Sequence, residues 1–251
     1  MRVGLLSDIH GNRWALEAVL DHAAGQRVDE IWNLGDILSG PLDVAGTADL
    51  LMRLSLPTIR GNTERQLLAC AESPGTPSDQ FAFERCEPRH RAWLASLPET
   101  LLRGDILLCH GTPSSDEDPL LETVEAERLR LATPEEIEAR VPAAAPGLVV
   151  CGHTHVARVV RMEGGRLIVN PGSIGLQAYD HDQPSLHYVD NGSPHASYAI
   201  VEQVGEALGA WQVSQFRIAY DWQSAAACAA KHGRPEWAYA LRTGVAMRQL
   251  S

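Results

Sequence analysis

Five short apolar runs recur along the first part of the chain, and each ends in polar residues, which predicts a series of buried strands. The runs span residues 3–8, 31–36, 56–62, 106–110 and 148–153. Between the first two runs, apolar residues recur at helical spacing over residues 13–24. A strand, a helix and a further strand in this order predict a crossover that places the two strands parallel.

The alternation of strand and helix continues beyond the second strand. Further helices are predicted over residues 43–54, 64–71 and 87–97, and the loop at residues 73–79 is rich in turn formers. We expect this loop and its flanking helices to form a helical cap over the site, around residues 73–97. Residues 120–141 are charged and helix-favouring, with a helix start at Thr133-Pro134, which predicts a solvated helical face.

Beyond residue 155 the pattern changes to consecutive strands. Strand-like segments occupy residues 157–162, 166–170, 196–202 and 213–220, and a Gly-Gly turn within residues 163–166 joins the first two as a hairpin. Consecutive hairpins predict an antiparallel second sheet. Two short helices, divided at residues 233–235, are expected within residues 222–242.

The composition fits one α/β domain over residues 1–251, because 251 residues with 45% hydrophobic content can bury one large core. A formal net charge of -11, from 32 acidic and 21 basic residues, argues against long nucleic acid or an anionic membrane as a partner. The first apolar run is too short for a signal peptide, so we expect a soluble, cytoplasmic protein. Five widely spaced cysteines without a CxxC pair predict reduced, structural thiols.

Potential metal ligands follow every one of the five predicted strands. Asp8 and His10 follow the first strand, and two residues apart on extended backbone they would point to the same side. A glycine adjoins a candidate in each later motif: Gly35-Asp36, Gly61-Asn62, His110-Gly111 and Gly152-His153-Thr154-His155. A single pair of this kind is usually a turn or a cap. Five of them, in one order along one chain, indicate a clustered site.

In this order, the motifs DIHGN, GDILSG, RGNTE, CHGTP and CGHTH resemble those of the calcineurin-like metallophosphoesterases, over about residues 1–180. The later segment NPGSIG, at residues 170–175, resembles a loop of the compact prokaryotic branch, which includes phosphodiesterases and relatives of diadenosine tetraphosphatases. The resemblance implies a four-layer αββα sandwich with two facing mixed β-sheets.

The resemblance also places seven residues in a two-metal centre. It assigns Asp8, His10 and His155 to one ion and Asn62, His110 and His153 to the other, with Asp36 bridging both. Oxygen and nitrogen ligands without a thiolate suit first-row transition metals, so manganese is the first candidate, with iron, zinc, cobalt and nickel as alternatives. Two such ions would orient a bridging hydroxide for in-line attack on phosphorus. Asp36, Asn62 and His110 are the candidates for direct catalytic roles.

These features predict a metal-dependent phosphoester hydrolase, a phosphodiesterase or phosphatase acting on a small phosphorylated substrate such as a nucleotide. Thr63 stands where many relatives carry a histidine that contacts phosphate and serves as a general acid, and threonine cannot replace that acid. Two alternatives therefore stay open, a metal-binding scaffold and a nucleotide sensor, each with weak or no turnover.

Several neighbouring residues have ordinary structural explanations. Asn12 is expected to cap the helix that follows it, Glu64 to lie at a helix start, and Arg60 either to stabilise charge or to pair with a carboxylate. His181 and His187 are expected to be surface histidines. Substrate specificity would come from residues 73–97 and 176–195, whose sequence identifies neither the substrate nor the preferred ester, and the oligomeric state is equally open.

Overall fold

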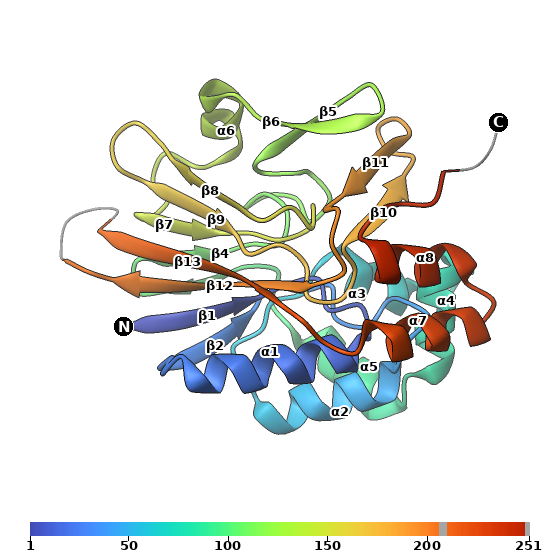
Figure 1. Cartoon of the computed structure of the whole chain (residues 1–251). Helices are drawn as coiled ribbons and strands as arrows, with labels where there is room; N and C mark the ends of the chain where they lie inside the picture. Colours follow the sequence, from blue (N-terminus) through green and yellow to red (C-terminus); the bar gives the residue numbers. More distant parts are fainter. Residues whose placement is uncertain (206–209, 249–251) are drawn as a thin grey trace.

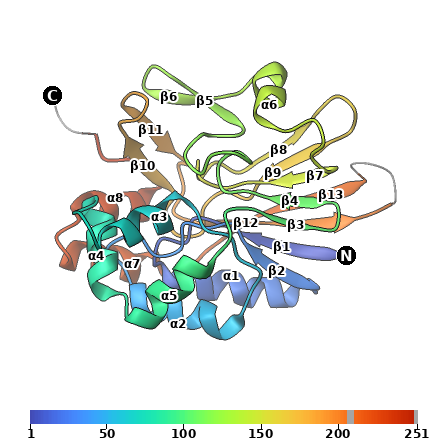
Figure 2. The same ribbon diagram turned by 180° about the vertical axis from the view of Figure 1, so that it is seen from behind.

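Two mixed sheets face each other in the computed structural model, which describes residues 1–205 and 210–248 (Figures 1 and 2). The first sheet has the order β13 (Trp211–Ile218), β12 (Ala196–Gln203), β1 (Arg2–Leu6) and β2 (Glu30–Asn33). The second has the order β3 (Leu101–Arg103), β4 (Ile106–Leu108), β7 (Leu148–Val150), β9 (Leu167–Asn170) and β8 (Arg158–Arg161). The pairs β1–β2, β4–β7 and β7–β9 are parallel.

The side chains of β1 divide between two layers of core. Val3 and Leu5 join the apolar cluster that fills the space between the two sheets, together with side chains of β4, β7 and β9. Leu6, the next residue along the strand, belongs instead to the cluster beneath the helices. Successive residues of a strand point to opposite faces, so the continuous apolar run of β1 fits a strand that is buried on both sides.

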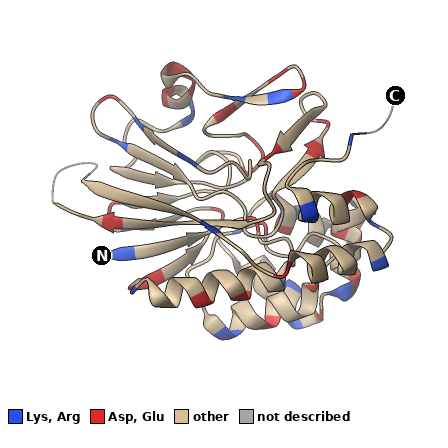
Figure 3. Cartoon of the chain, in the orientation of Figure 1, with Lys and Arg blue, Asp and Glu red and all other residues tan. Residues whose placement is uncertain are grey.

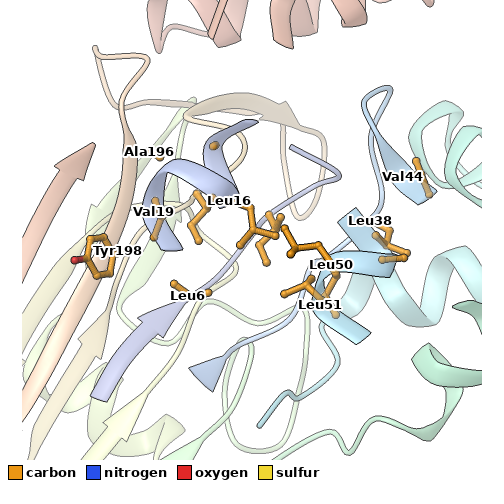
Figure 4. Close-up of a cluster of buried hydrophobic side chains, with 14 of the residues drawn as sticks. Leu6, Leu16, Val19, Leu38, Val44, Leu50, Leu51, Ala196 and Tyr198 are labelled. Carbon is orange, nitrogen blue, oxygen red and sulfur yellow. The ribbon is translucent and has the colours of Figure 1, made fainter. Parts of the chain in front are cut away.

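Helices cover the outer face of the first sheet. They are α1 (Arg13–Gly25), α2 (Val44–Leu54), α3 (Asn62–Ala69), α4 (Pro77–Arg85) and α5 (Pro88–Ser96), and near them lie α7 (Trp222–Lys231) and α8 (Pro235–Thr243). Figure 4 shows part of the core between α1, α2 and the sheet, where Leu16 and Val19 lie near Leu6. Six helices predicted from sequence are confirmed: α1, α2, α3 and α5 each to within two residues at either end, and α7 and α8 within the predicted range 222–242 to within one residue.

A thinner layer covers the outer face of the second sheet. In the described part of the chain its one helix is α6 (Pro134–Arg140), which buries Ile137 against the cluster that contains Val149 and Ile168. Thr133 caps α6 and Pro134 is its first residue, as the sequence predicts. The αββα arrangement with two mixed sheets is confirmed.

A third sheet lies beside the sandwich, in the order β10 (Ala178–His181), β11 (His187–Asp190), β6 (Arg128–Leu131) and β5 (Glu122–Glu125). The prediction of a helical face across residues 120–141 is therefore wrong for its first half. Glu125 lies opposite Arg128 in the β5–β6 hairpin and forms an ion pair with Arg130 at 3.2 Å, and opposite-charge pairs between strands stabilise a sheet. This pairing overrides the helix-favouring composition.

Two further predictions need correction. The strands after residue 155 do not form a separate antiparallel sheet, because β8 and β9 extend the second sheet while β12 and β13 extend the first. Instead of starting a new sheet, β12 pairs antiparallel with β1 of the first sheet. The strand predicted at residues 56–62 is reduced to a single bridge between Thr58 and Asn33.

Acidic and basic residues are interspersed over the helices and hairpins (Figure 3). Many of them pair, as Arg130 does with Glu136 and Arg65 with Asp116. Among residues 1–205 and 210–248, no helix has the length and apolar character needed to cross a membrane.

Candidate metal centre

Loops at one end of the two sheets carry the candidate ligands. The loops after β1, β2, β4 and β7 hold six of them, and the seventh, Asn62, is the first residue of α3. Parallel strands place their carboxyl ends at the same edge of a sheet, so these loops meet. The loop after β1 is bonded to the loop after β2, because the backbone N–H groups of Ile9 and His10 donate to Asp36 O at 2.8 and 3.0 Å.

Asp8, His10 and His155 form the first group, and their ligand atoms lie within 4.8 Å of one another. His155 Nε2 lies 3.3 Å from Asp8 Oδ1 and 3.1 Å from His10 Nε2. All three side chains are buried. The two imidazoles and the carboxylate therefore surround one small volume.

Asp36, His110 and His153 form the second group, again with ligand atoms within 4.8 Å of one another. His110 Nε2 lies 3.3 Å from Asp36 Oδ1, and the Asn62 amide joins the group, with its Oδ1 3.1 Å from His153 Nδ1. Asp36 Oδ2 faces the other way and lies 3.9 Å from His10 Nε2. The two oxygens of Asp36 thus face one group each.

Backbone carbonyl groups fix the orientation of three of the four imidazoles. The Nδ1 atoms of His10, His110 and His155 lie 2.8, 2.7 and 2.6 Å from the carbonyl oxygens of Ser39, Leu34 and Leu176. A carbonyl oxygen only accepts, so each Nδ1 carries a proton, and Nε2 is the nitrogen of each ring that faces the site and could bind a metal. His153 differs, because its Nδ1 faces Asn62.

Five of the seven residues have left-handed backbone: Asp8, His10, Asp36, His153 and His155, with φ between 51° and 69°. Non-glycine residues rarely adopt this region, and such strain clusters at functional sites. The expectation that extended backbone aims Asp8 and His10 to the same side is therefore wrong, because β1 ends at Leu6 and both residues lie in tight turns. The turns bring the two side chains together instead.

Two of the adjoining glycines allow close approach of the ligand loops. A Cβ on Gly61 would lie 2.2 Å from Asp36 Oδ1, and one on Gly152 would lie 3.0 Å from Asp8 Oδ2. Any side chain at these positions would push a carboxylate out of place. Glycine beside a ligand is thus a requirement of this packing.

The charged groups shift one another's pKa values strongly. Burial would raise the pKa of Asp36, but the positive charge of His110, whose Nε2 lies 3.3 Å from Asp36 Oδ1, outweighs burial and holds that pKa well below its usual range. Burial would lower the pKa of His110, yet the carboxylates of Asp36 and Asp8 raise it to about 10. Burial, together with the charge on His110, lowers the pKa of His153 to about 4. The pKa values of the two imidazoles in this group therefore shift in opposite directions.

The donor set fits divalent transition-metal ions. Both carboxylate oxygens of Asp8 and the Nε2 of His110 are buried without a hydrogen-bond partner among residues 1–205 and 210–248. Leaving such atoms unpaired is costly unless a ligand satisfies them. Carboxylate, amide and neutral imidazole ligands suit manganese, iron, cobalt, nickel and zinc.

Glu64 supports the site in a way that the sequence did not indicate. Its carboxylate is fully buried and accepts from the backbone N–H groups of Asp36, Ile37 and Gly61 at 2.8, 2.7 and 2.8 Å. Burial and the negative charge of Asp36 raise the pKa of Glu64 to about 7. The signal in sequence was an acidic residue two positions after Asn62, which also fits an ordinary helix start.

Thr63 contacts the second group directly. Its backbone N–H and its hydroxyl both donate to Asp36 Oδ1, at 3.0 and 2.9 Å. The hydroxyl is therefore committed to orienting the carboxylate between the two groups. This placement is consistent with the expectation that Thr63 does not serve as a general acid.

A cavity of about 640 Å³ opens beside the two groups. One wall contains the candidate ligands Asp36, Asn62 and His153, and the start of α4 adds Thr76 and Ser78. The remaining walls come from the third sheet, from residues 117–119, from Arg140 of α6 and from Trp237 of α8. Segments predicted to set specificity, residues 73–97 and 176–195, both contribute to the lining, whereas the contribution of the β5–β6 hairpin was missed because that segment was predicted to be helical.

The structure also places the other candidates named from sequence. Asn12 caps α1 as predicted, since its Oδ1 accepts from Ala15 N. Arg60 pairs with Glu99. His181 is exposed, but His187 is only 4% exposed and lines the cavity, so its prediction as a surface histidine is wrong. Cys109 and Cys151 are buried among apolar side chains, in agreement with a structural role.

Comparison with known families agrees with this geometry. Residues 1–192 match the model of the calcineurin-like phosphoesterase superfamily domain. The chain belongs to this superfamily. A metallophosphoesterase from Sphaerobacter thermophilus has a similar structure, with 27% sequence identity and a TM-score of 0.73, covering 98% of this chain and all of that one.

Two archaeal proteins are also similar to this calcineurin-like phosphoesterase. The structure of a hypothetical protein from Pyrococcus horikoshii has 19% identity and a TM-score of 0.73, and the match covers 97% of this chain and 98% of that one. An uncharacterized protein from Methanocaldococcus jannaschii is 23% identical over 247 residues, which is 94% of each chain. The similarity to the Pyrococcus structure concerns the fold.

Proposed function

We propose that this calcineurin-like phosphoesterase is a two-metal hydrolase that cleaves a phosphoester of a small molecule, either a phosphodiester or a phosphomonoester. The observation that carries the proposal is the convergence of two groups of ligand atoms on Asp36, whose oxygens face one group each. The unpartnered buried atoms of Asp8 and His110 support it, because cations would satisfy them.

In this proposal Asp8, His10 and His155 hold one ion, Asn62, His110 and His153 hold the other, and Asp36 lies between them. Two divalent ions bound there would lower the pKa of a water, orient it for in-line attack and neutralise the phosphoryl oxygens. The chain contributes placement, since the backbone carbonyl groups described above keep three imidazoles aimed at the site. Manganese is the first candidate for the ion.

Three hydroxyl groups beside the site already have hydrogen-bond partners, which supports direct attack by water rather than a covalent phosphoenzyme. Thr63 donates to Asp36, and Ser39 donates to Asp79 at 2.6 Å. The Thr154 hydroxyl accepts from Asn170. In addition, burial raises the pKa of the Cys109 thiol to about 12, so this buried thiol is a poor nucleophile.

Turnover of an activated diester, bis-p-nitrophenyl phosphate, with added manganese tests the proposal. Asp36→Asn should lower the turnover rate by at least about 100-fold, because loss of a ligand should exceed the 10- to 100-fold effect of losing a supporting partner. Asp105→Asn is a control, since Asp105 is an exposed carboxylate between β3 and β4. Absence of metal-dependent turnover in the wild-type protein would favour the scaffold or the nucleotide sensor.

A substrate made chiral at phosphorus tests the identity of the nucleophile. Direct in-line attack by water should invert the configuration at phosphorus, whereas two displacements through a phosphoenzyme would retain it. Trapping of a phosphorylated side chain by acid quenching would contradict the mechanism while leaving the metal dependence intact.

A further inference from the structure

His187 is a buried polar side chain whose second nitrogen lacks a protein partner. The residue is 4% exposed, and its Nδ1 donates to the carbonyl oxygen of Ser185 at 2.8 Å. In a neutral imidazole this leaves Nε2 as an acceptor. No residue in the described ranges donates to that atom, and the side chain lines the cavity beside the metal centre.

A row of rings leads from the metal centre to His187. The ring of Tyr179 packs on the candidate ligand His155, with ring centroids 4.6 Å apart. Tyr179 and His181 are two residues apart on β10, so they share a face, and His181 is paired with His187 across the β10–β11 hairpin. Two residues of a strand span about 7 Å, so Tyr179 and the His181–His187 pair are separated along β10 by about this distance. A ring system can therefore lie against this wall, between the metal centre and His187.

Three apolar side chains contribute to the opposite walls of the cavity. Val124 and Leu129 come from the β5–β6 hairpin, and Trp237 stands with its ring edge-on to His10, with centroids 6.0 Å apart. A cavity of about 640 Å³ has the size of sites that enclose small organic molecules. Its far end is therefore suited to an organic group rather than to a protein chain.

The charges around this end disfavour a second anionic group. Arg140 is the one arginine or lysine among the described lining residues, and its guanidinium already donates to three carbonyl oxygens and to Thr123 Oγ1. The lining also contains the carboxylates of Glu117, Asp118 and Glu122, of which Glu117 pairs with Arg65 and Glu122 with Arg158. A phosphate bound in the cavity would therefore meet carboxylates and find no unpaired guanidinium among the described lining residues.

From these observations we infer that the cavity binds the uncharged, ring-containing organic group of the substrate, and that His187 accepts a hydrogen bond from an N–H or O–H of that group. The substrate class is thus a phosphoester with one phosphoryl unit at the metal centre and a neutral ring system, such as a nucleoside. This inference rests on the proposed function for the position of the phosphoryl unit.

Three p-nitrophenyl phosphodiesters with the same chromophore test the inference by their kcat/KM with manganese. The thymidine 5′ ester should exceed the methyl ester by at least about ten-fold, because rings stack on Tyr179 and His187 gains a partner. Adding a 3′-phosphate to the thymidine ester should lower kcat/KM by about ten-fold through repulsion. Equal values for the thymidine and methyl esters would overturn the inference and leave the proposed function standing.

His187→Phe keeps a ring in the cavity and removes the acceptor. The ratio of thymidine to methyl ester kcat/KM should fall by about ten-fold in this variant. His195→Phe is the matched control, because His195 is half-buried, bonds to Ser193, packs on Trp222 and lies outside the cavity. An unchanged ratio in His187→Phe would contradict the role given to His187.

Binding of analogues that lack the p-nitrophenyl leaving group separates the two proposals. Thymidine 5′-methylphosphonate should bind the manganese-loaded protein at least about ten-fold more tightly than methyl methylphosphonate, as measured by calorimetry. If neither ester is hydrolysed but this difference in Kd is found, the hydrolase proposal fails and the cavity inference stands. Equal dissociation constants would overturn the cavity inference whatever the turnover.

Discussion

Glu64 holds the backbone on both sides of Asp36 through three hydrogen bonds from N–H groups. In Glu64→Gln one acceptor oxygen becomes an NH₂ group that faces N–H donors. We expect a loss of about 1–3 kcal/mol in the free energy of unfolding, and a 10- to 100-fold weaker affinity for manganese. Urea unfolding and metal titration measure the two effects.

Glu138→Gln is the control for that change, because Glu138 is an exposed glutamate on α6. Its substitution should stay within about 0.5 kcal/mol of the wild type. Equal effects of the two substitutions would show that the bonds of Glu64 contribute nothing specific to the site.

Thr63 lies against the Asp36 carboxylate. A histidine at this position would place an imidazole where it could protonate the leaving group of the substrate. Thr63→His keeps the backbone N–H that donates to Asp36 and loses only the hydroxyl. We expect kcat for alkyl esters, which have poor leaving groups, to rise by about 10-fold or more, with a smaller change for p-nitrophenyl esters. A parallel change for both classes of ester would show that leaving-group protonation does not limit the wild-type rate.

At the scale of elements, Asn12 joins α1 to the segment around Gly175 and to Tyr220. Its Oδ1 caps the helix, and its Nδ2 donates to Gly175 O and to the Tyr220 hydroxyl at 2.9 and 3.2 Å. Loss of a cap costs about 1 kcal/mol, and the unpaired buried groups add about 1–3 kcal/mol. Asn12→Ala should therefore destabilise the protein by about 2–4 kcal/mol in denaturant unfolding.

Asp221→Ala provides the comparison, because Asp221 caps α7 in a similar way but is exposed. It should cost only about 1 kcal/mol. If Asn12→Ala cost no more than Asp221→Ala, the link between α1 and the Gly175 segment would not contribute to stability.

The hairpins of the third sheet show where local sequence patterns mislead. The alternation in Arg128-Leu129-Arg130-Leu131 is typical of a strand with one apolar face, but the surrounding charged residues favour a helix on composition. The parallel bridge from Arg128 to Tyr188 of β11 joins residues that are 60 positions apart. A contact between residues so far apart cannot be predicted from a short segment of the sequence.

At the scale of the whole molecule, metal binding should stabilise the fold. An ion that binds only the folded state adds about 2.7 kcal/mol when its concentration is 100 times Kd. The melting temperature should therefore rise with added manganese in the wild type and much less in Asp36→Asn, as calorimetry or circular dichroism would record. An equal rise in both proteins would place the stabilising ions elsewhere.

The affinity for manganese should also depend on pH. Since the carboxylates of Asp36 and Asp8 raise the pKa of His110 to about 10 against the effect of burial, a metal must displace its proton. Protonated His110 stabilises the folded protein. This contribution is fully present at pH values below about 6.5, the pKa of histidine in the unfolded chain, and is lost as the pH rises through about 10, the pKa of His110 in the folded protein. Affinity should therefore increase about ten-fold per pH unit between about pH 7 and 9, with release of one proton.

Titration calorimetry in buffers of different ionisation enthalpy counts that proton directly. A pH-independent affinity over this range would show that His110 is neutral before the metal binds. His195→Phe serves as a control here too, because His195 lies away from both groups of ligand atoms.

The sequence by itself determined the crossover of the first strands, most helices and the identity of seven converging side chains, because each depends on a local apolar period or on a motif at a strand end. Only the tertiary structure decided the left-handed turns of Asp8 and His10, the bonds from Glu64 and the burial of His187. These features arise from contacts between segments far apart in the chain. The sequence therefore pointed to the candidate metal centre, whereas the cavity beside it depends on how two distant hairpins meet.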